Sequence, residues 1–100
     1  MLLSKTEFLI LSIMSKNGFR ELYGLEMLEL SDGKIKRGTI YTTLQRMQDK
    51  EFVTSYKEDK PDNVPGNPRR LYKITGKGKL ALNSYQELQN FGLDPVLITG

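Results

Sequence analysis

The chain has 100 residues, a net charge of +3 at pH 7, 38% hydrophobic residues, and neither cysteine nor histidine. This length fits one domain, and the hydrophobic content is too high for a disordered chain. The missing residue types exclude disulfides, thiolate metal sites and the commonest catalytic bases and nucleophiles. We therefore expect a protein that is not an enzyme and needs no metal or cofactor.

No apolar run reaches the length of about 18 residues that a membrane-spanning helix needs. The N-terminal segment is apolar but contains Ser4, Lys5 and Glu7. It shows neither a basic leader nor a small-residue cleavage site. We expect a cytoplasmic protein without membrane contact.

Positive charge is concentrated in two segments. Residues 33–50 contain five basic residues and one acid, and residues 63–86 contain five basic residues and no acid. If the fold brings the two segments together, they form one basic face of the kind that binds nucleic acid. The alternative is two separate solvated surfaces.

The first predicted helix begins at Ser4, because Ser4 and Glu7 have the spacing of a capping box. Asn17-Gly18 ends it, since both residues tolerate the left-handed cap. Its apolar residues cover much of its circumference, so more than one surface must bury it. A second helix is predicted over residues 21–30, with Gly24 near its start marking close packing.

The third predicted helix lies in the segment GTIYTTLQRMQDKEF, residues 38–52. Its apolar side contains Ile40, Leu44 and Met47. Small hydroxyl residues on the other side suit close approach to another surface better than the long side chains of a purely solvated helix. That side comprises Gly38, Thr39, Thr42, Arg46, Asp49 and Lys50, with Gln45 at its edge.

Two strands are predicted next, in residues 52–58 and 69–75, because both runs are rich in β-branched and aromatic residues. The segment between them, DKPDNVPGNP, holds three of the four prolines and is predicted to be a loop. Thr75 is predicted to cap a last helix that ends at Gly92.

Three helices followed by a β-hairpin and a further helix predict a mainly α fold, the winged helix-turn-helix with a two-stranded wing. In such folds the third helix enters the DNA major groove and the hairpin lies along the flanking backbone. The predicted DNA contacts are Lys36, Arg37, Thr39, Tyr41, Thr42, Gln45, Arg46, Arg69 and Arg70.

Three of these assignments leave alternatives open. Tyr41 lies at the edge of the core, where packing competes with a hydroxyl–phosphate bond. Arg69 and Arg70 alternate along a strand, so one should face DNA while the other pairs with an acid of the loop. Acidic residues of the hairpin would repel phosphate if they pointed inward; these are Glu58, Asp59 and Asp62.

The motifs YGLEMLE, GTIYTTLQRM, EFV and RRLYKITGKGK occur in this order. With them the chain resembles the smaller subfamily of the PadR family of bacterial transcription regulators over about residues 4–90. The resemblance implies a two-fold dimer held by the C-terminal helix with help from the first helix. It also implies a palindromic operator and, usually, repression. The short last helix departs from the family pattern and leaves a thin dimer surface.

Ala81, Tyr85 and Leu88 form a stripe that has no obvious place in so small a core, so we expect it to be buried against a second copy. The predicted dimer residues are Leu9, Ile13, Ala81, Tyr85, Leu88 and Phe91. The predicted division is 1–75 for DNA binding, 76–92 for the dimerisation helix and 93–100 for a tail. Some members of the family bind flat apolar compounds at the dimer interface. A small apolar effector is therefore an open alternative, although the chain has no tryptophan to stack on it.

A different class of function is a winged-helix adaptor whose basic face meets an acidic protein. The acidic hairpin residues favour it, whereas the small side chains of the third helix argue against it. Duplex DNA binding that weakens steeply with salt would separate the two.

Overall fold

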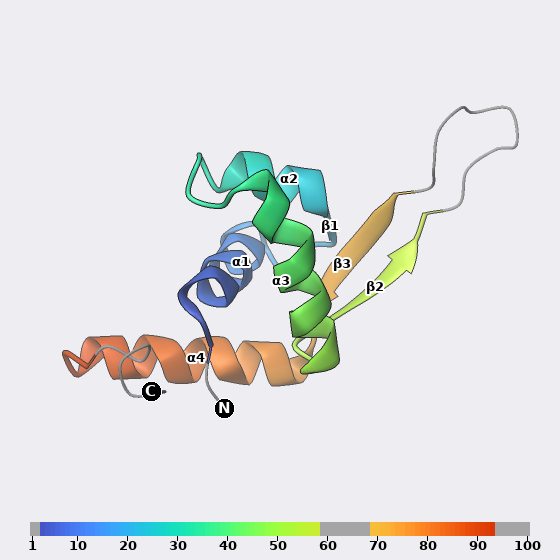
Figure 1. Ribbon diagram of the computed structural model, residues 1–100. Helices are drawn as coiled ribbons and strands as arrows, with labels where there is room; N and C mark the ends of the chain where they lie inside the picture. Colours follow the sequence, from blue (N-terminus) through green and yellow to red (C-terminus); the bar gives the residue numbers. More distant parts are fainter. Residues whose placement is uncertain (1–2, 59–68, 94–100) are drawn as a thin grey trace, which may run out of the picture.

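The computed structural model describes residues 3–58 and 69–93 (Figure 1). Three helices come first, a hairpin follows, and a long helix ends the described chain, so the predicted mainly α winged helix-turn-helix is confirmed. No helix in these two ranges is long and apolar enough to cross a membrane. The elements are α1 (Lys5–Lys16), β1 (Leu22–Tyr23), α2 (Gly24–Leu30), α3 (Arg37–Asp49), β2 (Val53–Lys57), β3 (Arg70–Ile74) and α4 (Gly76–Asn90).

Local capping residues set the start of α1 and both ends of α4 where the sequence predicts them. The Ser4 hydroxyl accepts from the Glu7 amide at 3.2 Å, and the Glu7 carboxylate accepts from the Ser4 amide at 2.8 Å. Thr75 caps α4 by accepting from the Gly78 amide at 3.0 Å. The backbone leaves α4 through Gly92, whose φ of 77° favours glycine.

The second helix begins later than predicted, at Gly24 rather than at residue 21. Leu22 and Tyr23 instead form β1, which pairs antiparallel with β3. The Glu26 carboxylate accepts from the Tyr23 amide at 2.9 Å, which marks the true helix start. The apolar spacing misled the prediction, because the partner of Leu22 is Tyr72, far along the chain.

The sheet has the strand order β1-β3-β2, so β3 is central although it comes last. The hairpin β2–β3, called the wing from here on, projects away from the helices (Figure 1). Its register pairs Val53 with Ile74 at the base and Lys57 with Arg70 further out. The predicted loop, with Asp59 and Asp62, lies outside the described residues.

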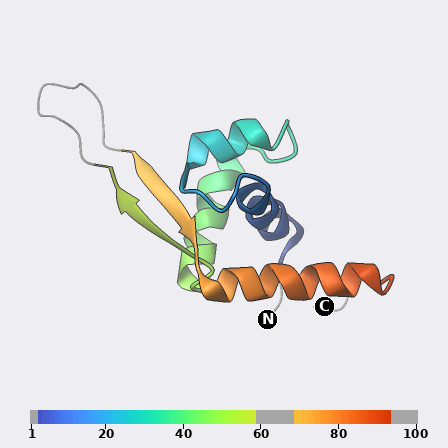
Figure 2. The same ribbon diagram turned by 180° about the vertical axis from the view of Figure 1, so that it is seen from behind.

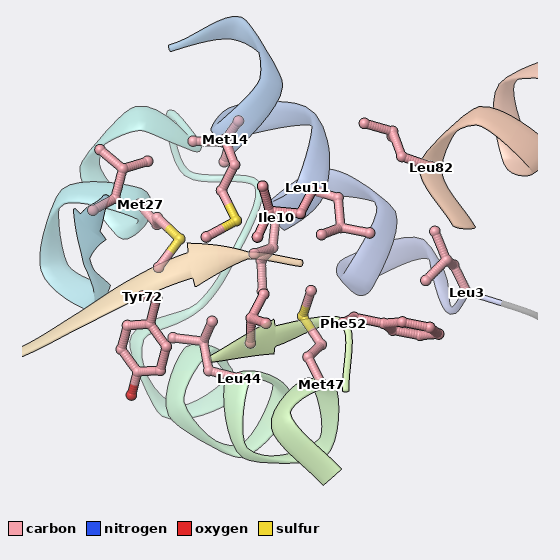
Figure 3. Packing of buried hydrophobic residues seen from close by; sticks show 14 of the residues in the cluster. Leu3, Ile10, Leu11, Met14, Met27, Leu44, Met47, Phe52, Tyr72 and Leu82 are labelled. Atoms are coloured by element: carbon pink, nitrogen blue, oxygen red, sulfur yellow. The ribbon is translucent and has the colours of Figure 1, made fainter. Parts of the chain in front are cut away.

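Side chains from all four described helices and from the sheet meet in one core (Figure 3). Met14, Met27 and Leu44 are fully buried in it. The remaining buried hydrophobic residues are Leu3, Ile10, Leu11, Ile13, Leu22, Ile35, Ile40, Met47, Phe52, Val53, Tyr72, Ile74, Ala81, Leu82 and Tyr85.

The reason given for a dimer stripe on α4 is wrong, because two of its residues belong to the core of the monomer. Ala81 is 1% exposed and Tyr85 is 5% exposed. The Tyr85 ring stacks on Phe8 of α1, with centroids 4.0 Å apart. Figure 2 shows α4, orange to red, crossing below α1, in dark blue. The second apolar side of α1 is thus covered by α4 of the same chain.

An ion pair ties the start of α1 to the end of α3. The Glu7 side chain is fully buried, and its two oxygens accept from Lys50 Nζ at 3.0 and 2.9 Å. Lys50 was expected on the exposed side of the third helix. It turns inward because it lies just past the last turn of α3, where the chain approaches Glu7.

Candidate nucleic-acid interface

The outer side of α3 is solvent-exposed over its whole length, and the opposite side is anchored in the core. Ile40, Leu44 and Met47 are fully buried. Thr43 is also buried, and its hydroxyl donates to the Thr39 carbonyl at 2.9 Å. The exposed residues of the helix and its N-cap are Lys36, Arg37, Gly38, Thr39, Tyr41, Thr42, Gln45, Arg46 and Asp49. All seven DNA contacts predicted in this region therefore face solvent.

A shallow depression on this side is lined by Tyr41, Thr42, Gln45, Arg46 and Asp49. Gln45 Nε2 donates to Asp49 Oδ1 at 3.2 Å, so these two side chains partly satisfy each other. Within residues 3–58 and 69–93, Arg46 forms no ion pair. Its guanidinium can therefore fork onto a guanine or hold a phosphate.

Tyr41 packs against the core and is also exposed, so both packing and contact with a phosphate stay compatible with its position. One edge of its ring packs against Gly24, where an added Cβ would lie 2.7 Å from Cε1 of Tyr41. The side chain nevertheless stays 48% exposed. Gly24 thus permits a close approach that fixes the ring while the outer side of Tyr41 remains available to a partner.

The wing arginines lie on opposite faces of the sheet. Arg70 alternates with the buried residues Tyr72 and Ile74, so it points to the face that carries the core. Its Nη1 donates to Ser55 Oγ at 3.2 Å, and the Ser55 hydroxyl in turn donates to Gln48 of α3. Arg70 therefore lies on the side of α3.

Arg69 takes the other face, where its guanidinium lies over the Tyr23 ring at 5.3 Å from the centroid. The sequence predicts that one arginine pairs with an acid of the hairpin. The hairpin acid that the structure describes, Glu58, instead accepts a hydrogen bond from the Tyr23 hydroxyl at 2.6 Å. This hydrogen bond is the largest cause of the raised pKa of Tyr23.

A groove of about 660 Å³ separates α2 from the wing. Arg69 and Arg70 line it together with Glu26 and Glu29, so its charge is mixed. Burial raises the pKa of Tyr72 at the bottom of this region, while nearby Arg70 lowers it. The mixed charge makes the groove a poorer phosphate site than the open side of α3.

Only part of the second basic segment, with Arg70, lies on the side of α3. Lys77 lies 3.8 Å from Glu51, and Lys79 lies over the Phe19 ring at 4.6 Å from the centroid. Both lie in the first turn of α4, which begins next to the end of α3 (Figure 1), and these contacts engage them. The positive charge beside α3 comes instead from the start and middle of that helix and from the wing.

Sequence reasoning missed two wing residues on the side of α3. Ser55 bridges Arg70 and Gln48, and Lys57 is exposed directly opposite Arg70 in the hairpin register. The hairpin register would have placed both residues on the side of α3, but the predicted strand boundaries do not determine that register. Among the described residues, no group of three or more acidic side chains gathers as a metal site.

The residues predicted for a dimer interface divide between core and surface. Ile13, Ala81 and Tyr85 are buried in the monomer, and Leu9 and Leu88 are half-buried. Phe91 is 81% exposed. Leu80 and Leu93 are exposed as well and were not predicted. A cavity of about 340 Å³ between α1 and the end of α2 is lined by Leu9, Ser12, Ile13, Lys16, Asn17, Leu30, Ser31 and Lys34.

The family model described as the transcriptional regulator PadR-like family matches residues 10–84, from α1 to the middle of α4. The chain belongs to the PadR-like family. The resemblance carried by the motifs of α2, α3 and the wing is thereby confirmed, and with it DNA-binding transcriptional regulation.

Solved structures of PadR-like proteins have the same fold. A PadR family transcription regulator from Clostridium difficile R20291 is 29% identical, with a TM-score of 0.70 over 89% of this chain and 92% of that chain. A PadR-like transcriptional regulator from Bacillus cereus is 28% identical, with a TM-score of 0.65 over 86% of this chain and 82% of that chain. No curated protein matches the sequence.

Proposed function

We propose that this PadR-like protein is a homodimeric repressor of the cytoplasm that binds a palindromic DNA operator. The observation that carries the proposal is the exposed side of α3, which combines small polar residues with the guanidinium of Arg46, unpaired among the described residues, and has Arg70 of the wing on the same side. A helix with small outer side chains can enter the major groove closely, and a cationic wing can hold the flanking backbone.

The roles of the individual residues follow from their chemistry and their place on α3. Thr39 and Thr42 are short enough to contact base edges or a thymine methyl group. Gln45 and Arg46, further along the helix, have the side chains that pair with adenine and guanine. Lys36, Arg37, Tyr41 and Arg70 surround this patch and are suited to phosphate contacts, which position the protein without reading sequence.

The basic residues at the start of α3 support this orientation. Lys36 and Arg37 stand where a cation opposes the positive end of the helix dipole, and the first turn contains no acid. A DNA phosphate at this end would compensate the local penalty.

The dimer rests on α4 and on the cavity beside α1. Phe91 is too exposed for a monomer's large aromatic residue, and Leu80 lies on the same side of α4. The cavity walls contain Leu9, Ile13 and Leu30, and the rim contains Lys16 and Lys34. We propose that Phe91 of a second copy enters this cavity, and that residues 76–92 act as both core helix and dimerisation helix.

Repression follows from the two-fold arrangement. Two copies of α3 would occupy major-groove half-sites separated by about 34–36 Å, or a multiple of this, and exclude other proteins from the operator. A small apolar effector would compete with Phe91 for the cavity and thereby loosen the dimer. An adaptor that binds an acidic protein instead would show no preference among DNA sequences.

The DNA-binding proposal is tested by selecting duplexes from a random pool and measuring their affinity against salt. The logarithm of affinity should fall with the logarithm of salt concentration, with a slope of about −0.9 per phosphate contacted. Arg46→Ala should lose about 1–3 kcal/mol and relax preference at one position per half-site. Arg70→Ala should weaken all duplexes alike.

Lys77→Ala is the matched control, because Lys77 is an exposed cation outside α3 and the wing and already pairs with Glu51. It should change affinity less than either arginine variant. Equal losses for all three variants, or affinity that is indifferent to salt, would disprove the assignment of α3 and the wing to DNA.

The dimer proposal is tested by sedimentation of the wild type and of Phe91→Glu at micromolar concentration. The wild type should sediment as a dimer and Phe91→Glu as a folded monomer with weaker operator binding, since Phe91 contributes little to the core. Asn90→Glu adds the same charge one residue away and should remain dimeric. A monomeric wild type would contradict both the dimer and palindromic binding.

A further inference from the structure

The outer face of the sheet, away from the core, carries an arrangement of side chains that DNA contact does not use. Tyr23 of β1 and Tyr56 of β2 are both opposite Leu71 of the central strand β3. Residues opposite one another in neighbouring strands point to the same face. The two tyrosines therefore flank Leu71 on the outer face, one from each edge strand.

Each tyrosine reaches across β3 to a glutamate of the other edge. The Tyr23 hydroxyl donates to Glu58 Oε1 at 2.6 Å, and the Tyr56 hydroxyl donates to Glu21 Oε2. Because Glu21 precedes β1 and Glu58 follows β2, the two hydrogen bonds run diagonally in opposite senses. We call Tyr23–Glu58 and Tyr56–Glu21 the crossed pairs.

The crossed pairs add side-chain links between parts of the molecule that the backbone pairing of β1 with β3 also joins. β1 has only two residues and leads directly into α2. The wing extends away from the helices, so its outer half has few neighbours among them (Figure 2). Glu58 lies beyond the end of β2, where its amide donates to the Arg69 carbonyl at 2.7 Å. The pairs thus connect the outer half of the wing to the segment that starts the helix-turn-helix.

We infer that the crossed pairs hold the wing at a fixed angle to α2 and α3, so that Tyr23 and Tyr56 are positioning residues for DNA binding. This inference rests on the proposed function. Arg70 and α3 must meet the same duplex, and a wing that pivots at its base loses affinity because ordering it costs entropy on binding. The Arg69 guanidinium also contacts the face of the Tyr23 ring.

The crossed pairs also explain why two acidic residues occur in a DNA-binding domain. Glu21 and Glu58 are engaged on the face opposite Arg70, away from the duplex. A role in electrostatics alone and a positioning role predict opposite effects when Glu58 is truncated. Removing an acid near DNA strengthens phosphate binding, whereas removing the acceptor of the Tyr23 hydroxyl frees the wing.

The first measurement uses the protein without DNA. Amide hydrogen exchange of β2 and β3 should become faster by about fivefold or more in Tyr23→Phe/Tyr56→Phe, because one part-buried and one exposed hydrogen bond contribute modestly. Exchange in α1 should be unchanged. Tyr72→Phe is the control, since its hydroxyl has no hydrogen-bond partner among the described residues. Unchanged exchange in the wing of the double variant would overturn the inference whatever the DNA result.

The second measurement compares Glu58→Gln with Glu58→Ala on a duplex selected by the wild type. Both variants remove the charge, but glutamine keeps an acceptor for the Tyr23 hydroxyl. Positioning predicts that Glu58→Ala binds about threefold or more weakly than Glu58→Gln. Equal affinities would reduce Glu58 to a surface charge and overturn the inference. A wild type that binds no duplex would refute the proposed function, while the exchange measurement would still decide whether the pairs hold the wing.

Discussion

Replacing Lys50 with methionine should destabilise the protein strongly, although the residue looks like an ordinary surface lysine in the sequence. The change leaves the Glu7 carboxylate, which is fully buried, with the Ser4 amide as its remaining hydrogen-bond partner in residues 3–58 and 69–93. Breaking a fully buried pair costs about 3–5 kcal/mol, and exposed pairs contribute about 0.2–1 kcal/mol. Lys50 is 40% exposed, so we expect a loss of about 2 kcal/mol.

The assay is thermal and urea unfolding followed by circular dichroism at one fixed protein concentration. A loss of about 2 kcal/mol corresponds to a fall in Tm of roughly 8–16 °C for a domain of this size. Lys77→Met is the matched control, because its partner Glu51 is 3.8 Å away and 79% exposed. It should change the free energy of unfolding by less than about 0.5 kcal/mol.

A double variant separates the buried charge from lost packing. Glu7→Gln/Lys50→Met has no uncompensated charge, and glutamine can still accept from the Ser4 amide, so it should be more stable than Lys50→Met alone. If Lys50→Met destabilised the chain no more than Lys77→Met, the buried carboxylate would not need its partner and the reasoning would fail.

Three further predictions follow from close contacts and from the tyrosines. Gly78→Ala should lower the free energy of unfolding, measured in urea, by about 2 kcal/mol or more, because the new Cβ would lie 2.3 Å from the Phe52 carbonyl oxygen. Gly76→Ala is the control: its Cβ would have no atom within 4 Å, so the change should be neutral or stabilising. Gly24→Ala displaces the movable ring of Tyr41, so operator affinity should fall more than Tm does, and adding it to Tyr41→Ala should cause little further loss. The hydrogen bonds of the crossed pairs raise the pKa of both tyrosines above 10.0. The stability that the pairs contribute is therefore complete below pH 10 and is lost as pH rises through the folded pKa. An absorbance titration should show that Glu58→Ala lowers the pKa of one tyrosine, and an unchanged titration would contradict this.

Signals within a few residues of one another predicted the helices and the wing. The Ser4 capping box, the Thr75 cap and Gly92 each act through hydrogen bonds or backbone angles of their own turn, so the sequence alone reveals them. The apolar spacing of α3 identified its buried and exposed sides for the same reason. Seven predicted DNA contacts on and beside α3 are consequently exposed as expected, while their contact with DNA stays a prediction.

The errors all involve partners distant in sequence. Leu22 was assigned to a helix because its strand partner, Tyr72, cannot be identified from local spacing. Tyr85 was assigned to a dimer interface because nothing in the sequence shows that Phe8 receives its ring. Lys50 was placed on the exposed side because its partner, Glu7, is at the other end of the helical domain.

The central place of β3 has a consequence for biosynthesis. A nascent chain that ends before residue 70 already contains both edge strands, β1 and β2, but has no strand between them. The first three helices can pack as they emerge, since domains fold from the N-terminus during synthesis. The sheet must wait for β3, whose pairing with β1 joins residues about fifty positions apart and carries a correspondingly large loop-closure cost. Until then Leu22 and Val53, both buried in the finished fold, stay uncovered. Unfinished chains should therefore be the form of this protein that is most prone to aggregation and proteolysis.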